Sequence, residues 1–271
     1  TGEESGAQVA LRARRLGLDH SQVKVLAEIQ LEKMLATLAA TAAGAVAGLI
    51  TGWLNVKLKI MDLLASILMM IALYSINLRI MGGPNVPLIN DPTLFVLLQP
   101  EGMDDYIARP LVLVAIVLAA KLLLDWFFAT ERGLAIRATG SNARMARAQG
   151  VNTGAMLLLG MAISNGLVGL AGALFAQTQG GSDISMGIGT IVIGLAAVIV
   201  GESILPSRRL VYATLAVVIG AIAYRFFIAL ALNSDFIGLK AQDLNLVTAV
   251  LVAVALVIPQ LKRKFAKRKP S

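Results

Sequence analysis

Long apolar runs of this 271-residue chain contain charged side chains, among them Lys121, Asp125 and Arg225, and a charge at the centre of a bilayer costs about 2.5–3.5 kcal/mol. Lys121 and Asp125 are four residues apart, so on a helix they lie side by side and neutralise one another. This spacing predicts either a structural ion pair or a relay for a proton or another ion. Arg225 stands in another apolar run, where it either reaches the membrane interface or faces a transport pathway.

Polar side chains in or beside the apolar runs predict a second kind of chemistry, the lining of a path for a polar solute. Such groups are costly in hydrocarbon unless they bond another helix or a ligand. Asn77 also suits a bond to another helix, and Ser185 also suits the cap of the helix that follows it. The predicted pathway residues are Tyr74, Asn77, Ser164, Asn165, Asp183 and Ser185.

Several other chemistries are excluded by composition. The chain has no Cys and a single His, His20, which excludes disulfides, thiolate catalysis and a histidine cluster for a metal. No G-x-x-x-x-G-K-[ST] sequence occurs, so no P-loop holds ATP. No nucleophile and base converge in the sequence. We therefore expect no catalytic residues, no metal and no cofactor, and a protein that is not an enzyme.

The elements that hold these side chains are predicted to be membrane helices. The chain is 57% hydrophobic with a mean hydropathy of +0.78, and its 15% of charged residues is far below the roughly 25% of soluble domains. We predict an all-α polytopic membrane protein of about seven transmembrane helices, with some segments broken or re-entrant near glycine-rich loops. The seven apolar runs are Leu35–Leu54, Ile60–Met81, Pro110–Phe128, Gly154–Leu174, Ile188–Leu205, Leu210–Leu232 and Leu244–Leu261.

Charge sets the predicted domains and orientation. Lys and Arg follow the first, third, fifth and seventh runs, and Asp and Glu collect in the connections between, so the basic connections are expected in the cytoplasm. The net charge of +8 then reflects topology, and we expect no nucleic-acid partner. Residues 1–34 form a polar N-terminal segment, 35–261 the membrane domain and 262–271 a basic cytoplasmic tail, which anchors the last helix or binds anionic lipid.

The connector between the third and fourth runs is the most informative segment. Ser141 or Asn142 suits a helix N-cap, residues 143–149 favour a helix, and Gly150 suits the position after its end. A short basic helix is therefore predicted on the cytoplasmic side. It either lies on the lipid surface or docks onto a cytoplasmic partner, and its shortness and alanine content favour docking.

Three stretches of the sequence are similar to the permease subunits of bacterial ABC importers of the branched-chain amino acid and ribose type. They are Leu73–Gly82, then Gly133–Asn142 with Ala148–Asn152, then Gly166–Ala176 running into Asp183–Gly187. Within that family the chain most resembles the tryptophan/tyrosine permease subgroup, and the likeness covers roughly Leu38 to Lys264.

The resemblance implies a set of partners and a role for the connector. It implies two cytoplasmic ATP-binding subunits, a second permease copy and an external substrate-binding protein. The connector looks like the segment that docks in a cleft of the ATP-binding subunit. The residues that carry this coupling role are Arg137, Ser141, Asn142, Arg144, Arg147 and Gly150.

The expected function is that of the permease subunit of an ATP-driven importer for a small solute, an amino acid or related compound, in the bacterial inner membrane. An ion-coupled secondary transporter that uses Lys121 with Asp125, or Arg225, is the alternative. Family members usually begin with a hydrophobic helix and a broken one ahead of the first run, whereas residues 1–34 are charged. We expect a fragment, a fusion or a frame error there.

Overall fold

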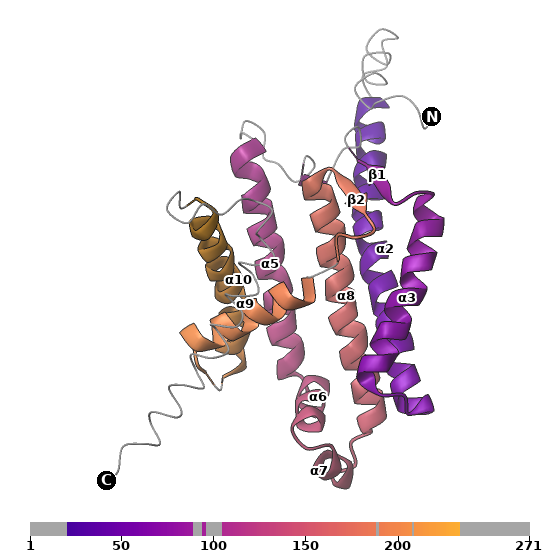
Figure 1. Cartoon of the computed structure of the whole chain (residues 1–271), viewed down its shortest axis with the longest axis vertical. Helices are drawn as coiled ribbons and strands as arrows, with labels where there is room; N and C mark the ends of the chain where they lie inside the picture. Colours follow the sequence, from indigo (N-terminus) through magenta and orange to yellow (C-terminus); the bar gives the residue numbers. More distant parts are fainter. Residues whose placement is uncertain (1–20, 89–93, 96–104, 188–189, 208, 234–271) are drawn as a thin grey trace, which may run out of the picture. The chain divides into compact units, whose positions relative to one another are not determined.

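The computed structural model describes residues 21–88, 94–95, 105–187, 190–207 and 209–233, and nearly all of these are helical (Figure 1). The elements, in order, are α2 (Ser21–Leu58), α3 (Asp62–Met81), β1 (Asn85–Pro87), α5 (Asp105–Ala129), α6 (Glu131–Ser141), α7 (Ala143–Ala148), α8 (Thr153–Gln179), β2 (Gly181–Asp183), α9 (Thr190–Ile204) and α10 (Leu210–Asn233).

Among the residues that the structure describes, five helices are long and apolar enough to cross a membrane, which supports the predicted all-helical membrane fold. These segments are Met34–Leu58, Asp62–Met81, Ile107–Ala129, Thr153–Gln179 and Leu210–Leu230. They correspond to the first four and the sixth of the predicted runs. The seventh run, Leu244–Leu261, lies outside the described residues.

The predicted full span at Ile188–Leu205 is not confirmed. Within it the structure describes α9, whose 15 residues make a helix about 22 Å long, against a hydrocarbon core of roughly 30 Å.

The described chain also contains a small antiparallel sheet of β1 and β2, in which Val86 pairs with Ser182.

The described chain divides into two compact units, and each is described by itself. Unit 1 comprises residues up to Ala120 and from Trp126 to Ile184; unit 2 comprises Lys121–Asp125 and the residues from Ser185 onward. Unit 1 thus contains α2, α3, most of α5, α6 to α8 and the sheet. Unit 2 contains α9, α10 and one turn of α5.

Unit 1 is organised by the close contact of α2 with α8, which lie side by side (Figure 1). A Cβ on Gly44 would overlap the carbonyl oxygen of Asn165, and a Cβ on Gly48 would overlap that of Met161. A Cβ on Gly169 of α8 would likewise overlap the carbonyl oxygen of Ala40. Since lipid supplies no hydrophobic drive between helices, such backbone proximity is how these two helices hold together.

The C-terminal end of α8 is held by hydrogen bonds of Gln177 and by a cluster of apolar side chains. Gln177 accepts a hydrogen bond of 2.8 Å from the backbone N–H of Leu94 and donates one of 3.3 Å to the hydroxyl of Thr37. Leu94 and Phe95 are buried with Val112 of α5 and Leu174 of α8. Gly180 ends α8 with a φ of 69°, a left-handed conformation that glycine adopts without strain.

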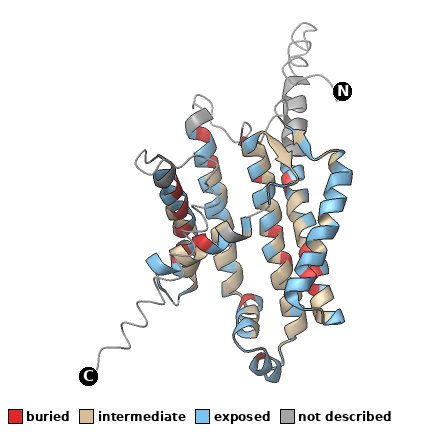
Figure 2. Ribbon diagram, in the orientation of Figure 1, coloured by how far each residue is buried: buried red, intermediate tan, exposed pale blue. Residues whose placement is uncertain are grey.

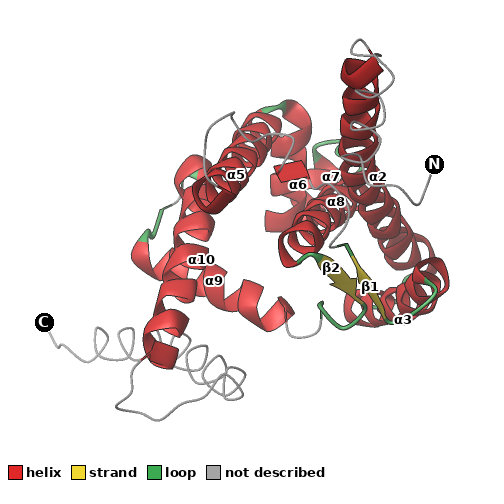
Figure 3. Ribbon diagram, turned by 90° about the horizontal axis from the view of Figure 1, so that it is seen from above, coloured by secondary structure: helices red, strands yellow, loops and turns green. Residues whose placement is uncertain are grey.

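The sheet links the ends of α3 and α8 (Figure 3). Beyond the ladder itself, the N–H of Leu88 donates to the carbonyl oxygen of Gly180 at 2.8 Å. The N–H of Ile184 donates to the carbonyl oxygen of Pro84 at 3.0 Å. These bonds satisfy backbone groups that would otherwise be left unpaired at the two helix ends.

Unit 2 is held by the same kind of close helix contact. A Cβ on Gly201 of α9 would overlap the carbonyl oxygen of Ala216, and one on Gly220 of α10 would overlap that of Ala197. Next to this contact, Ala196, Tyr224 and Ile228 form a buried cluster.

Helix α3 of unit 1 is exposed over most of its surface, with Ala65 its one buried residue (Figure 2).

Candidate functional site

The connector between α5 and α8 folds into two short helices, α6 and α7, through local capping. Thr130 caps α6, since its hydroxyl accepts a hydrogen bond of 3.3 Å from the N–H of Gly133. Asn142 caps α7, since its side-chain oxygen accepts a bond of 3.1 Å from the N–H of Met145. Side-chain oxygens at these positions replace the hydrogen-bond acceptors that a helix start lacks.

The end of α7 turns sharply into α8. The N–H of Gly150 donates to the carbonyl oxygen of Arg147 at 3.0 Å, and Gly150 has a φ of 83°, which side chains with a Cβ rarely adopt. Asn152 then caps α8 by accepting a bond of 3.1 Å from the N–H of Ala155. The predicted short helix is present as Ala143–Ala148, with Asn142 rather than Ser141 as its cap.

The connector is held against the membrane helices on one side and is open on the other. Ala146 is buried, and the hydroxyl of Thr153 accepts a bond of 3.2 Å from the Nε of Arg147. Gly133 is buried against the end of α5, where a Cβ would overlap the carbonyl oxygen of Phe127. The connector therefore contacts the end of α5 and the start of α8.

All six predicted coupling residues are exposed: Arg137, Ser141, Asn142, Arg144, Arg147 and Gly150. Arg147 in addition donates a hydrogen bond to Thr153 at the start of α8. The coupling role of these residues stays a prediction.

The intramembrane charges Lys121 and Asp125 form an ion pair, with Lys121 Nζ 2.5 Å from Asp125 Oδ2. The second carboxylate oxygen accepts a hydrogen bond of 2.8 Å from the hydroxyl of Thr214 on α10. Both charged side chains are nearly buried, at 10% and 11% exposure. Arg225 is exposed on α10, and no carboxylate among the described residues pairs with it.

The predicted pathway residues differ in their exposure and surroundings. Tyr74 and Asn77 are exposed, one helical turn apart on α3, and Ser164 is exposed on α8. Asn165 instead packs against Gly48 of α2, where a Cβ on the glycine would come 2.8 Å from that of Asn165. The amide of Asn165 donates to the carbonyl oxygen of Met161 in its own helix at 3.0 Å.

The last two pathway candidates lie after α8 and belong to different units. Asp183 pairs with Asn85 in the small sheet of unit 1. Ser185 is exposed and belongs to unit 2. The assignment of all six residues to a pathway therefore stays a prediction.

Two polar partners were missed at the sequence level. Gln177 lies in the apolar helix α8 and bridges Thr37 and Leu94, so the criterion that selected Asn165 would have selected it as well. Thr214 donates a hydrogen bond to Asp125, but it is 89 residues away in the sequence, and no neighbouring residue indicates that the two meet. Within the described residues, no group of three or more His, Cys, Asp or Glu gathers as metal ligands do.

Comparison with known proteins gives one family over most of the chain. The family described as "Branched-chain amino acid transport system / permease component" matches residues 18–258. A tyrosine transport system permease protein of Clostridioides difficile is 38% identical over 214 residues, which are 79% of this chain and 69% of that protein. The uncharacterized protein RP368 of Rickettsia prowazekii is 31% identical over 202 residues, 73% of this chain and 69% of that one.

A short match of another kind accompanies these. The DNA repair protein RadA of Aquifex aeolicus is 55% identical over 37 residues, which are 14% of this chain and 8% of that protein. No solved structure matches the chain with statistical significance.

Proposed function

This chain belongs to the family of branched-chain amino acid transport permease components, and on that basis we propose that it is the membrane subunit of an ATP-driven importer. It is a multi-pass protein of the inner membrane and a transporter subunit rather than an enzyme. In the proposed complex, a cytoplasmic ATP-binding subunit supplies the energy. A second permease copy and an external substrate-binding protein complete the assembly.

The observation that carries this proposal is the α6–α7 connector. Each of its two helices is capped by a side chain of the connector itself, Thr130 for α6 and Asn142 for α7. One side packs on α8 and the other presents exposed Arg137 and Arg144. An element that packs on α8 with one side and presents basic side chains on the other is suited to transmit movement of a docked subunit to α5 and α8.

The proposed cargo is a small solute, an amino acid or a related compound. This follows from the family description and from the relative named a tyrosine transport system permease protein. Residues of this chain that would contact the solute are the exposed polar groups on the spans, Tyr74, Asn77 and Ser164. Selection among solutes would rest with the external binding protein.

An ion-coupled carrier is the competing function, and the Lys121–Asp125 pair is the observation that bears on it. An ion or proton relay needs a charged group that is free to change partners. Here the carboxylate is bound by Lys121 and by Thr214 at once, which favours a structural role.

The two functions are separated by the energy source of uptake. Cells that express the complete transporter are given tritiated tyrosine, with arsenate to deplete ATP or with a protonophore to collapse the proton gradient. We expect arsenate to abolish uptake and the protonophore to leave most of it when glycolysis maintains ATP. Loss with the protonophore alone would establish the ion-coupled carrier instead.

A further inference from the structure

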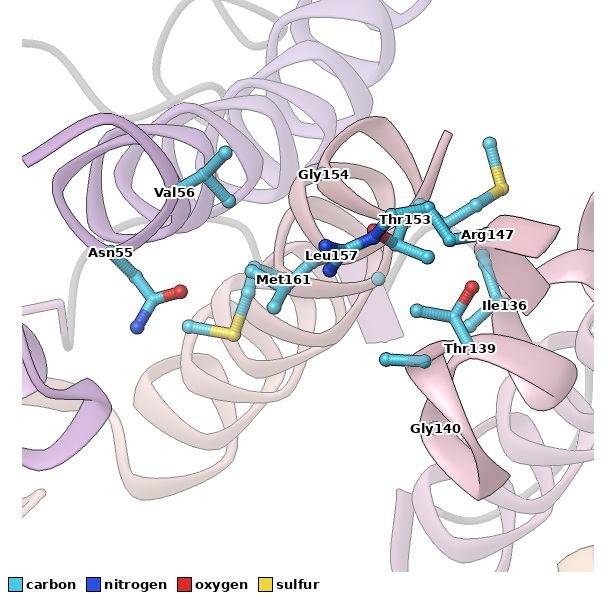
Figure 4. Close-up of a pocket in the computed structure, with 13 residues that line it drawn as sticks. Asn55, Val56, Ile136, Thr139, Gly140, Arg147, Thr153, Gly154, Leu157 and Met161 are labelled. Atoms are coloured by element: carbon cyan, nitrogen blue, oxygen red, sulfur yellow. The ribbon is translucent and has the colours of Figure 1, made fainter. Parts of the chain in front are cut away.

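A cavity of about 520 Å³ lies behind the connector in unit 1 (Figure 4). Its walls come from the last turn of α2, from α6 and α7, and from the first turns of α8. The function proposed above uses the outer side of the connector and leaves this cavity unexplained.

The cavity lies at the boundary of the hydrocarbon region. The membrane span of α2 ends at Leu58 and that of α8 begins at Thr153, and the cavity is lined by Asn55 and Val56 on one side and by residues 153–161 on the other. The helices α6 and α7, which cover it, lie outside the candidate spans. By the length and composition of these helices, one wall belongs to candidate spans and suits acyl chains, and the other lies outside them and suits lipid headgroups.

The wall on the membrane side is apolar and open. Val56, Leu157 and Met161 line it. A Cβ placed on Gly140 would meet nothing within 4 Å, and one on Gly160 would meet only Ile136, at 3.8 Å. The glycines therefore leave space that the protein itself does not fill.

One cationic side chain points into this space. Figure 4 shows the Arg147 side chain running from α7 across the cavity toward Thr153 and Leu157. Its Nε donates to the hydroxyl of Thr153, while in the part of the chain that the structure describes no carboxylate pairs with it. The outer guanidinium nitrogens remain available for an anion, which a guanidinium binds through two parallel hydrogen bonds.

We propose that this cavity binds an anionic phospholipid, with its phosphate on Arg147 and an acyl chain along Val56, Leu157 and Met161. The surrounding charge is complementary, because Lys57, Arg137 and Arg144 add positive charge to this end of unit 1 and anionic leaflets attract such clusters. An apolar wall at acyl-chain depth selects a lipid over free phosphate. The bound lipid would join α7 to α2 and α8, which places it on the connector that the proposed function makes the coupling element.

The experiment uses the full-length chain in vesicles that contain a phosphatidylglycerol with a photoactivatable group in its acyl chain. After irradiation, labelled peptides are identified by mass spectrometry. We expect label on the peptides that carry Leu157 or Met161, about tenfold above that from the matched phosphatidylcholine probe. Excess inorganic phosphate should leave this label unchanged.

Two variants and a control locate the site. Arg147→Gln should reduce the phosphatidylglycerol label to the phosphatidylcholine level, whereas Arg144→Gln, which removes the same charge from α7 outside the cavity, should keep it. Gly160→Leu places a side chain between α8 and the lining residue Ile136, which a Cβ on Gly160 would meet at 3.8 Å, and should lower the label with Arg147 intact. The test therefore does not depend on one variant folding. Equal labelling by both probes, label unaffected by Arg147→Gln and Gly160→Leu, or displacement by phosphate would overturn the proposal.

The readout requires no ATP and no solute. A failure of the importer function would leave the labelling result standing, and a failure of the labelling would leave the importer function standing. If another protein segment occupied the cavity, the probe would not label these peptides, and the lipid proposal would be wrong.

Discussion

The hydroxyl of Thr214 on α10 donates a 2.8 Å hydrogen bond to Oδ1 of Asp125 on α5, whose other oxygen holds Lys121. Thr214→Val removes this bond and should lower the free energy of unfolding by about 1 kcal/mol. Asp125→Asn should cost more, about 3–5 kcal/mol, because it leaves the nearly buried Lys121 charge without its partner. Thermal unfolding in detergent measures both. Thr178→Val, which loses only a bond to its own helix, is the matched control.

The role of this pair in transport can be tested by removing both charges together. Lys121→Met combined with Asp125→Leu replaces a nearly buried ion pair by apolar groups of similar size, a change that is often neutral for stability. We expect ATP-dependent uptake of tyrosine to persist in this double variant. If uptake were lost while the protein still reached the membrane, the pair would be a relay and the structural assignment would fail.

The α2–α8 contact predicts a strong effect of one added methyl group. Gly48→Ala places a Cβ on the Met161 carbonyl oxygen, so the helices must separate, at a cost of about 1–3 kcal/mol. Gly172→Ala on α8 has nothing within 4 Å and should be tolerated. The melting temperature of detergent-purified protein compares the two. Equal stability of the two variants would show that α2 and α8 are not in backbone contact.

The register of the small sheet predicts a cross-link. Val86 and Ser182 are directly opposite in an antiparallel pair, where Cα atoms are about 4.5–5.5 Å apart, within the range that a disulfide spans. Val86→Cys with Ser182→Cys should therefore form an intrachain disulfide on oxidation, which mass spectrometry detects. Val86→Cys with Met186→Cys, four residues out of register, should not. The reverse pattern would contradict the pairing.

We expect proline to have opposite effects at two positions of helix α7. Ala146→Pro removes the N–H that bonds the Asn142 carbonyl oxygen at 3.0 Å and places a ring in a buried site, so α7 should unfold. Ala143→Pro is at the first helical position, where no intrahelical N–H bond is lost and Asn142 is already extended. Solute-stimulated ATP hydrolysis of the assembled complex should vanish in the first and persist in the second, with both variants inserted in the membrane.

The features that the sequence predicted correctly are those that depend on neighbouring residues alone. The apolar runs of the first four and the sixth helices are long enough to fix a span, and Asn142 and Gly150 mark the two ends of α7 by their backbone preferences. The run at Ile188–Leu205 is not confirmed as a span, because apolar content alone does not say where a helix begins and ends. The described helix in it, α9, has 15 residues.

What the sequence could not predict depends on which helices meet. Asn165 was assigned to a pathway because it is polar in an apolar run, yet the contact with Gly48 places it at the α2–α8 interface. The same holds for Thr214, which is recognised as a partner of Asp125 only once α10 lies beside that turn of α5. The direction of Arg147 toward Thr153 also depends on how α7 turns into α8.

The most direct test of the account is the side of the membrane on which the connector lies. The chain has no Cys, and Met145 is 64% exposed on α7, so Met145→Cys gives a single reactive thiol on this helix. A membrane-impermeant maleimide should label it only after the cells are opened, and a short bifunctional reagent should then join it to the ATP-binding subunit. Labelling in intact cells would place the connector outside and contradict the importer.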